Sequence, residues 1–208
     1  MRSMGDAITD AVAETPPASG TPQRPLRADA RRNRERVLRA AQELFTADGL
    51  SVPLDEVARR AGVGAGTVHR HFPTKEALLA AIVVDRVEQL VATGRALAGS
   101  ADPGAALLRL LALMLDEGAV SHPLKAALVG TDFDLRTAAP GAAEDLHAAV
   151  AALLAEAQRA SQVRRDLDAD DVMALLAGVF GMYQHASADA ERAARLRDVL
   201  FDGLRTVR

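Results

Sequence analysis

The sequence of 208 residues contains no cysteine and no tryptophan, and aromatic residues make up only 3% of it. Without cysteine, the chain can form no disulfide, no thiolate zinc site and no cysteine nucleophile, and we expect a reducing, cytoplasmic location. Because aromatic residues are scarce, the core must come mainly from Leu, Val and Ala at close helix contacts. Hydrophobic residues reach 49%, which is enough to fill the core of a globular protein.

Long hydrophobic segments are also missing. The longest apolar run, from Ala105 to Leu115, is interrupted by Arg109 and falls short of the roughly 18 residues that span a bilayer. Residues 1–25 lack the apolar core of a signal peptide and are rich in Ala, Pro, Thr and Ser. We therefore expect a flexible N-terminal tail and no membrane partner.

Charge is unevenly distributed along the chain. Residues 24–75, the head, carry 11 basic and 6 acidic residues, and the remainder, the body, carries 14 basic and 22 acidic residues. The net charge of −3 is therefore the sum of +5 in the head and −8 in the body. A basic head on an acidic body indicates a polyanionic partner at one end only. An arginine-rich, solvated helix face is the alternative explanation.

Apolar residues recur every three or four positions, and alternating strand patterns are absent, which predicts an all-α fold. Gly49, Gly62 and Pro73 punctuate the first part of the chain, and a Gly-rich segment near residue 100 separates it from an alanine-rich second part. The expected division is a tail (1–25), a first helical domain (26–75) and a second helical domain (76–208). The expected helices are about 29–48, 53–61, 65–72, 74–98, 105–120, 122–130, 141–161, 169–186 and 189–206.

Two short helices joined by a glycine turn, behind a basic first helix, form the geometry that places one helix in the major groove of DNA. At 100° per residue, Val68 and Phe72 share the core-facing side of the helix at 65–72. The opposite side is small or polar, and it carries Gly66, Thr67, His69 and Arg70. Small residues allow a close approach to DNA, and an arginine can bind guanine with two hydrogen bonds.

The stretch RERVLRAAQELFTADGLSVPLDEVARRAGVGAGTVHRHFPTKEALLAAI resembles the N-terminal domain of the TetR family of bacterial regulators. The resemblance includes the Leu44–Phe45 pair, Gly49, the Ala61–Gly62–Val63 turn and the segment from Lys75 to Leu78. It implies an N-terminal three-helix helix-turn-helix domain and a C-terminal helical domain for ligand binding and dimerisation. It also implies a ligand-responsive transcription regulator, most often a repressor, that binds a palindromic double-stranded DNA operator as a homodimer and is released by a small-molecule effector.

By this resemblance, the residues at DNA-contacting positions are Ala65, Gly66, Thr67, His69, His71 and Lys75, to which the helix geometry adds Arg70. The sequence departs from the family pattern at Val52–Pro53, at Gly64 and at Ala65, where polar residues usually stand. Each departure removes a polar contact. We therefore expect Arg70 and the arginines ahead of the first helix to carry a larger share of DNA binding.

The last helix has an apolar stripe, and a similar stripe precedes it; both fit a dimer interface, although core packing is the commoner origin of such stripes. The stripe residues are Leu196, Val199, Leu200, Gly203, Leu204 and Val207, preceded by Val172, Leu175, Leu176, Val179 and Tyr183. Ligand residues stay unassigned. Pocket candidates by size and position, although core packing is the commoner role of such side chains, are Leu111, Met114, Phe133, Met173, Phe180 and Tyr183. Arg109 and Lys125 are candidates to anchor an acidic ligand, although exposed charges are commoner.

The sequence also bears on two other function classes. An enzyme is disfavoured, because the chain has no phosphate-binding loop and no nucleophile elbow, and His122, His147 and His185 are isolated. His69 and His71 stand about 200° apart on a helix and cannot bind one metal together. We expect no catalytic residues, no metal and no cofactor. A protein-interaction module with a basic docking helix would predict no preference for palindromic DNA.

Overall fold

The computed structural model describes residues 23–128, 134–185 and 190–206, and these parts of the chain are helical. The all-α prediction is confirmed there, with one isolated β-bridge between Val163 and Arg205. None of the helices in these ranges is both long and apolar enough to cross a bilayer. In chain order they are α1 (Gln23–Ala47), α2 (Leu54–Ala61), α3 (Ala65–His71), α4 (Lys75–Leu97), α5 (Pro103–Ala127), α6 (Leu135–Ala138), α7 (Pro140–Arg159), α8 (Ala169–His185) and α9 (Ala190–Leu204).

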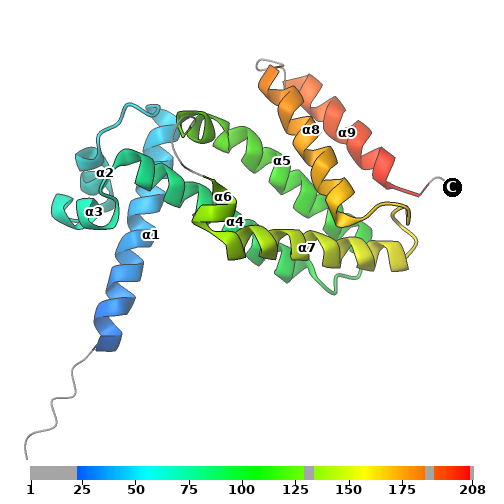
Figure 1. Cartoon of the computed structure of the whole chain (residues 1–208), viewed down its shortest axis with the longest axis horizontal. Coiled ribbons are helices and arrows are strands. Elements are labelled where there is room, and N and C mark those ends of the chain that lie inside the picture. Colours follow the sequence, from blue (N-terminus) through cyan, green and yellow to red (C-terminus); the bar gives the residue numbers. More distant parts are fainter. Residues whose placement is uncertain (1–22, 129–133, 186–189, 207–208) are drawn as a thin grey trace, which may run out of the picture.

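The helices form a head and a body (Figure 1). Helices α1 to α3 gather around the start of α4 at one end of the molecule, and α4 then runs into the body, where it packs with α5 and α7. Helices α8 and α9 pack side by side, and α8 also contacts α5 and α7. The head and the body are therefore joined through one continuous helix, α4.

The core of the head is built from aliphatic side chains of all four of its helices. Val37, Leu38, Val57, Val68 and Ile82 are each 2% exposed or less. Burying such a side chain contributes about 1.5 to 3 kcal/mol. The short helix α3 therefore owes its position to packing on its neighbours, since a helix of this length has little stability of its own.

A second cluster fills the body, and α4 contributes to both. Leu78 and Ile82 lie in the head cluster, whereas Leu90 and Val91 lie in the body cluster. Arg86 lies on α4 between these two groups, largely buried, and forms an ion pair with Glu117 of α5. At the point where the two clusters meet, this ion pair therefore ties α4 to α5.

Some helix boundaries differ from those expected. Helix α1 begins at Gln23 rather than near Asp29, so the arginines expected ahead of the first helix are part of it. Two helices expected at 105–120 and 122–130 are one helix, because α5 continues through Pro123 to Ala127. The short helix α6 was not predicted, and residues 1–22 of the expected tail lie outside the described residues.

Candidate DNA interface

The turn between α2 and α3 depends on a glycine in the left-handed region. Gly62 has φ 64° and ψ 37° and closes α2, and the Val63 N–H then donates to the carbonyl of Ala58 over 3.1 Å. Residues with a side chain adopt this conformation at a cost, which explains the glycine. Gly64 precedes α3 and offers no side-chain cap. Helix α3 therefore begins without a capping side chain at its N-cap position.

Helix α3 packs on the head through two buried side chains, and most of its other residues are exposed. Val68 is 0% and Phe72 3% exposed, as the helical geometry predicts. Thr67 is half-buried, whereas the other outward positions are exposed: Ala65, Gly66, His69, Arg70 and His71. Of the predicted outward residues, Gly66, His69 and Arg70 are thus exposed on the side of α3 away from Val68 and Phe72, and Thr67 borders them.

The side chain of Arg70 lies along its own helix. The Nε–H of Arg70 donates to the Gly66 carbonyl over 3.0 Å, and its Nη2 lies 3.4 Å from Thr67 Oγ1. Both contacts are exposed. Reaching a base edge requires only a side-chain rotation, since no buried partner holds the guanidinium.

His69 is held by the neighbouring helix. Its Nε2 lies 3.2 Å from Oδ1 of Asp55, which belongs to the first turn of α2. This contact ties the outward face of α3 to the N-terminal end of α2. His71 is exposed, and the centre of its ring lies 6.2 Å from the centre of the Phe72 ring.

The start of α4 is capped and carries a lysine directed at the head. Thr74 Oγ1 accepts a hydrogen bond from the Ala77 N–H over 3.1 Å. The pKa of Glu76 is lowered, first because its carboxylate accepts from its own backbone N–H and second because it accepts from the Thr74 hydroxyl. Lys75 is half-buried, with Nζ 5.6 Å from the centre of the Phe45 ring. It therefore lies at the base of the α3 face rather than on it.

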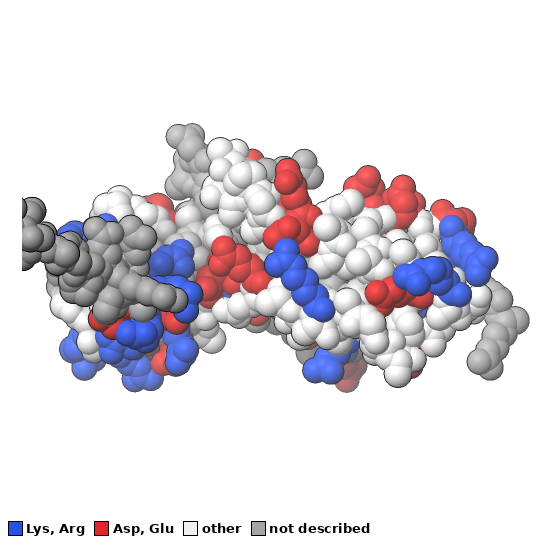
Figure 2. Space-filling view, turned by 90° about the horizontal axis from the view of Figure 1, so that it is seen from below, with Lys and Arg blue, Asp and Glu red and all other residues white. Residues whose placement is uncertain are grey.

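Basic side chains gather at this end of the molecule. Figure 2 shows Lys and Arg concentrated over the head, whereas acidic and basic side chains are mixed over the body. Several arginines of the head are exposed and paired only locally, such as Arg59 with Glu56 and Arg31 with Glu35. Such pairs contribute little to stability and exchange readily for phosphate.

Comparison with known proteins identifies this arrangement. Residues 37–82 match the family model described as bacterial regulatory proteins of the tetR family, and residues 102–206 match the C-terminal domain of SbtR-like transcriptional regulators. A TetR regulator from Mycobacterium vanbaalenii is 47% identical in sequence, with a TM-score of 0.70 over 88% of this chain and 100% of that one. The chain belongs to the TetR family.

Other relatives agree with this assignment. The TetR regulator SCO0520 from Streptomyces coelicolor is 30% identical, with a TM-score of 0.68 over 84% of this chain and 99% of that one. The regulator SrpR from Pseudomonas putida is 42% identical over 64 residues, which cover 30% of each chain. The relatives are transcriptional regulators, not enzymes, so the sequence resemblance to the family is confirmed and the enzyme alternative is set aside.

The TetR body carries an apolar groove between α8 and α9. The groove has a volume of about 690 Å³. Three large apolar side chains at or in it remain exposed: Leu175 by 43%, Met182 by 46% and Val199 by 70%. Two residues assigned to the same stripe from the sequence, Leu200 and Leu204, are instead 9% and 1% exposed and pack into the body core.

The two apolar stripes are thus divided between core and surface. In α8, Val172, Leu176 and Val179 are buried in the body, so core packing explains most of that stripe. Met182 was missed, although it lies seven residues, or two turns, after Leu175 and therefore on the same face of α8. Val207 and the side chain of Tyr183 lie outside the described residues.

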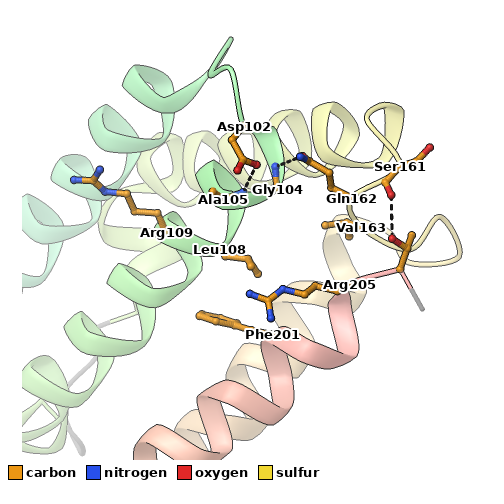
Figure 3. A pocket seen from close by; sticks show the side chains of 11 residues that line it. Asp102, Gly104, Ala105, Leu108, Arg109, Ser161, Gln162, Val163, Phe201 and Arg205 are labelled. Atoms are coloured by element: carbon orange, nitrogen blue, oxygen red, sulfur yellow. Dashed lines mark hydrogen bonds between the residues drawn. The ribbon is translucent and has the colours of Figure 1, made fainter. Parts of the chain in front are cut away.

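The candidate ligand residues do not converge on one cavity. Leu111 and Met114 are buried in the body core, and Phe180 and Met173 pack against it. Arg109 borders a pocket of about 620 Å³ between the start of α5 and the end of α9, where Figure 3 shows its guanidinium pointing away from Arg205 and Phe201. The side chains of Phe133 and Lys125 lie outside the described residues.

Proposed function

We propose that this TetR protein is a repressor that binds a palindromic operator as a homodimer and is released by a small-molecule effector. The observation that carries the proposal is the outward face of α3. Its apolar residues Val68 and Phe72 are buried beneath this face, and the residues that remain on it are small or polar. A helix with Ala65 and Gly66 in its first turn can approach the floor of the major groove closely.

Selection of duplexes from random DNA by the purified protein tests this directly. We expect two-fold symmetric sequences with half-sites one helical turn, or a multiple of it, apart. Thr67→Ala and Lys75→Ala should weaken binding to selected and random duplexes alike. Arg70→Ala should lose roughly 1 to 3 kcal/mol of discrimination at one base pair per half-site. Failure to enrich any duplex would contradict the proposal, and equal losses on both DNAs would assign Arg70 to phosphate.

The proposed dimer forms through the α8–α9 groove. A second copy of this chain fits the groove because the surface is apolar and its exposed side chains stand beside Gly178 and Gly203, which let a facing helix come close. The four helices that two copies contribute would bury Leu175, Met182 and Val199.

Sedimentation of a charged variant tests the dimer. Leu175→Glu combined with Val199→Glu should yield a folded monomer, because both side chains are exposed in the single chain. The control Ala152→Glu places a charge on an exposed position of α7 and should leave the dimer intact. A dimer unchanged by the double substitution would contradict this interface. Substitutions at Leu200 and Leu204 are unsuitable, since they would disrupt the core of the body.

Effector release is proposed to act through α4, which carries buried residues of both clusters. An effector that prefers the non-binding arrangement by about 100-fold supplies roughly 2.7 kcal/mol against operator binding. Operator DNA must then weaken effector binding by the same factor. Calorimetry of a candidate molecule with and without operator measures this coupling, and equal affinities would exclude that molecule as the effector.

A further inference from the structure

Helix α1 is longer than the head needs. Among its described side chains the buried ones begin at Val37, yet the helix starts at Gln23, about four turns earlier. Figure 1 shows this N-terminal half projecting from the head, on the side away from α8 and α9. Among the described side chains of this part, at residues 29–36, none is fully buried.

A row of basic residues borders the packed face of α1 and continues along the projecting part of the helix. At 100° per residue, positions 24, 27, 31 and 34 lie within an arc of about 80°, which overlaps the arc of the buried residues. All four positions are arginine. The row is centred about 80° from the buried residues and shares about 40° of their arc, so it borders the packed face of α1.

Arg34 fixes where this row of arginines lies. Its guanidinium stands 6.0 Å from the centre of the Phe72 ring, which closes the C-terminal end of α3. The row therefore begins beside the end of α3 and extends outward. Arg31, the next member, is exposed over 81% of its side chain, and its Nε lies 3.4 Å from Oε1 of the exposed Glu35.

We propose that the arginine row at positions 24, 27, 31 and 34 binds the phosphate backbone of DNA that flanks each half-site. The proposal rests on the proposed function, because α3 must lie in the major groove and α8–α9 must form the dimer. Helix α1 then projects away from the dimer axis, along the DNA. Ten residues of helix span about 15 Å, or roughly four base pairs beyond the half-site.

Like charges on one helix face destabilise the helix unless a counter-charge is present. The acidic residues nearest in sequence, Asp29 and Glu35, are engaged by Arg32 and Arg31 respectively. A run of phosphates supplies the missing charge along the whole row, and it needs no sequence specificity. The row thus fits the flank of an operator rather than its half-sites.

The test compares two duplexes selected by the wild-type protein. One ends at the outer edges of the half-sites, and the other extends by about eight base pairs of unrelated sequence on each side. The wild-type protein should bind the long duplex at least tenfold more tightly near 0.1 M salt. Its salt dependence on the long duplex should be steeper by about 5 in log affinity against log salt, because Arg24, Arg27 and Arg31 of both subunits would together neutralise six phosphates.

The variant Arg24→Ala/Arg27→Ala/Arg31→Ala should lose the advantage of the long duplex and keep its affinity for the short one. Arg34 is left in place because it packs on Phe72. Alanine favours helix at least as well as arginine, so α1 is retained. The matched control Arg32→Ala/Arg36→Ala/Arg39→Ala removes the same charge from a different face of α1 and should keep the long-duplex advantage.

Two results would overturn the inference while the proposed function stands. One is a wild-type protein that binds both duplexes equally, and the other is a loss of the long-duplex advantage that is the same in the control triple variant. A wild-type protein that selects no duplex at all would instead contradict the proposed function. Circular dichroism and sedimentation of each variant establish that folding and dimer formation are unchanged.

Discussion

The ion pair between Arg86 and Glu117 makes a strong prediction, because it joins α4 to α5 where the head and body cores meet. The Arg86 side chain is 12% exposed and its Nε–H is buried without an acceptor among the described residues, so Glu117 is its principal countercharge. Glu117→Ala leaves this guanidinium buried and unpaired. Removing one partner of a fully buried pair costs about 3 to 5 kcal/mol, and since Glu117 is 34% exposed we expect about 1.5 to 3 kcal/mol.

Urea unfolding at one fixed protein concentration measures this loss, since the stability of a dimer depends on concentration. The double variant Arg86→Met/Glu117→Leu removes both charges and should recover wild-type stability within about 1 kcal/mol. As a control, Asp145→Ala breaks the exposed pair with Arg95 and should cost less than about 1 kcal/mol. Equal losses for Glu117→Ala and Asp145→Ala would refute the reasoning, as would a double variant no more stable than the single one.

Three further predictions test local contacts. Gly118→Ala would place a Cβ 1.5 Å from a ring carbon of Phe180, so the ring must move and thermal unfolding should show a loss of about 1 to 3 kcal/mol. Thr74→Ala removes the cap of α4 and should cost about 1 kcal/mol in urea unfolding. The pKa of Asp166 is lowered to about 2, mainly by its hydrogen bonds from Arg164, so this contact favours the folded state above the ordinary Asp pKa and is lost as pH falls toward 2. Carboxyl NMR titration should follow it, and Arg164→Ala should return the midpoint toward 3.8.

The recognition helix could be predicted from sequence because one elementary rule determines its packing. Val68 and Phe72 are four residues apart, the other faces of the helix are small or polar, and Gly62 marks the turn before it. The contact of His69 with Asp55 could not be predicted in the same way. It joins two helices whose relative orientation depends on the whole core of the head.

The stripe of α9 shows a limit of periodicity. Leu200 and Leu204 face the body core, whereas Val199 faces outward, yet all three fall within one apolar pattern. A helix that packs on its own chain and also offers a surface to a partner is apolar on two adjoining faces, and the sequence does not tell which face is which. The break expected between helices at 105–120 and 122–130 is likewise absent, since α5 continues to Ala127.

Helix α4 contributes buried residues to both the head and the body. A substitution at Gly94 tests whether α4 transmits motion from the body to the head. A Cβ at this position would lie 2.9 Å from the Ala149 Cβ and 3.2 Å from a methyl of Leu110, so Gly94→Ala must push the far end of α4 away by a few tenths of an ångström. If α4 pivots at Arg86, its start at Lys75 moves by a similar distance in the opposite direction, because the two arms measure about 12 Å and 17 Å. In a dimer the change in separation of the two recognition helices is doubled.

We therefore expect Gly94→Ala to weaken binding to the selected operator by about 0.5 to 2 kcal/mol while random duplexes are bound as before. The additional substitution Ala149→Gly makes room for the new methyl group and should restore operator affinity, measured by fluorescence anisotropy. A variant that loses stability but binds operator normally would show that the packing of α4 on α7 does not set the position of the recognition helix. Failure of Ala149→Gly to restore affinity, in a folded and dimeric protein, would lead to the same conclusion, because the contact between these two positions is the one that the reasoning depends on.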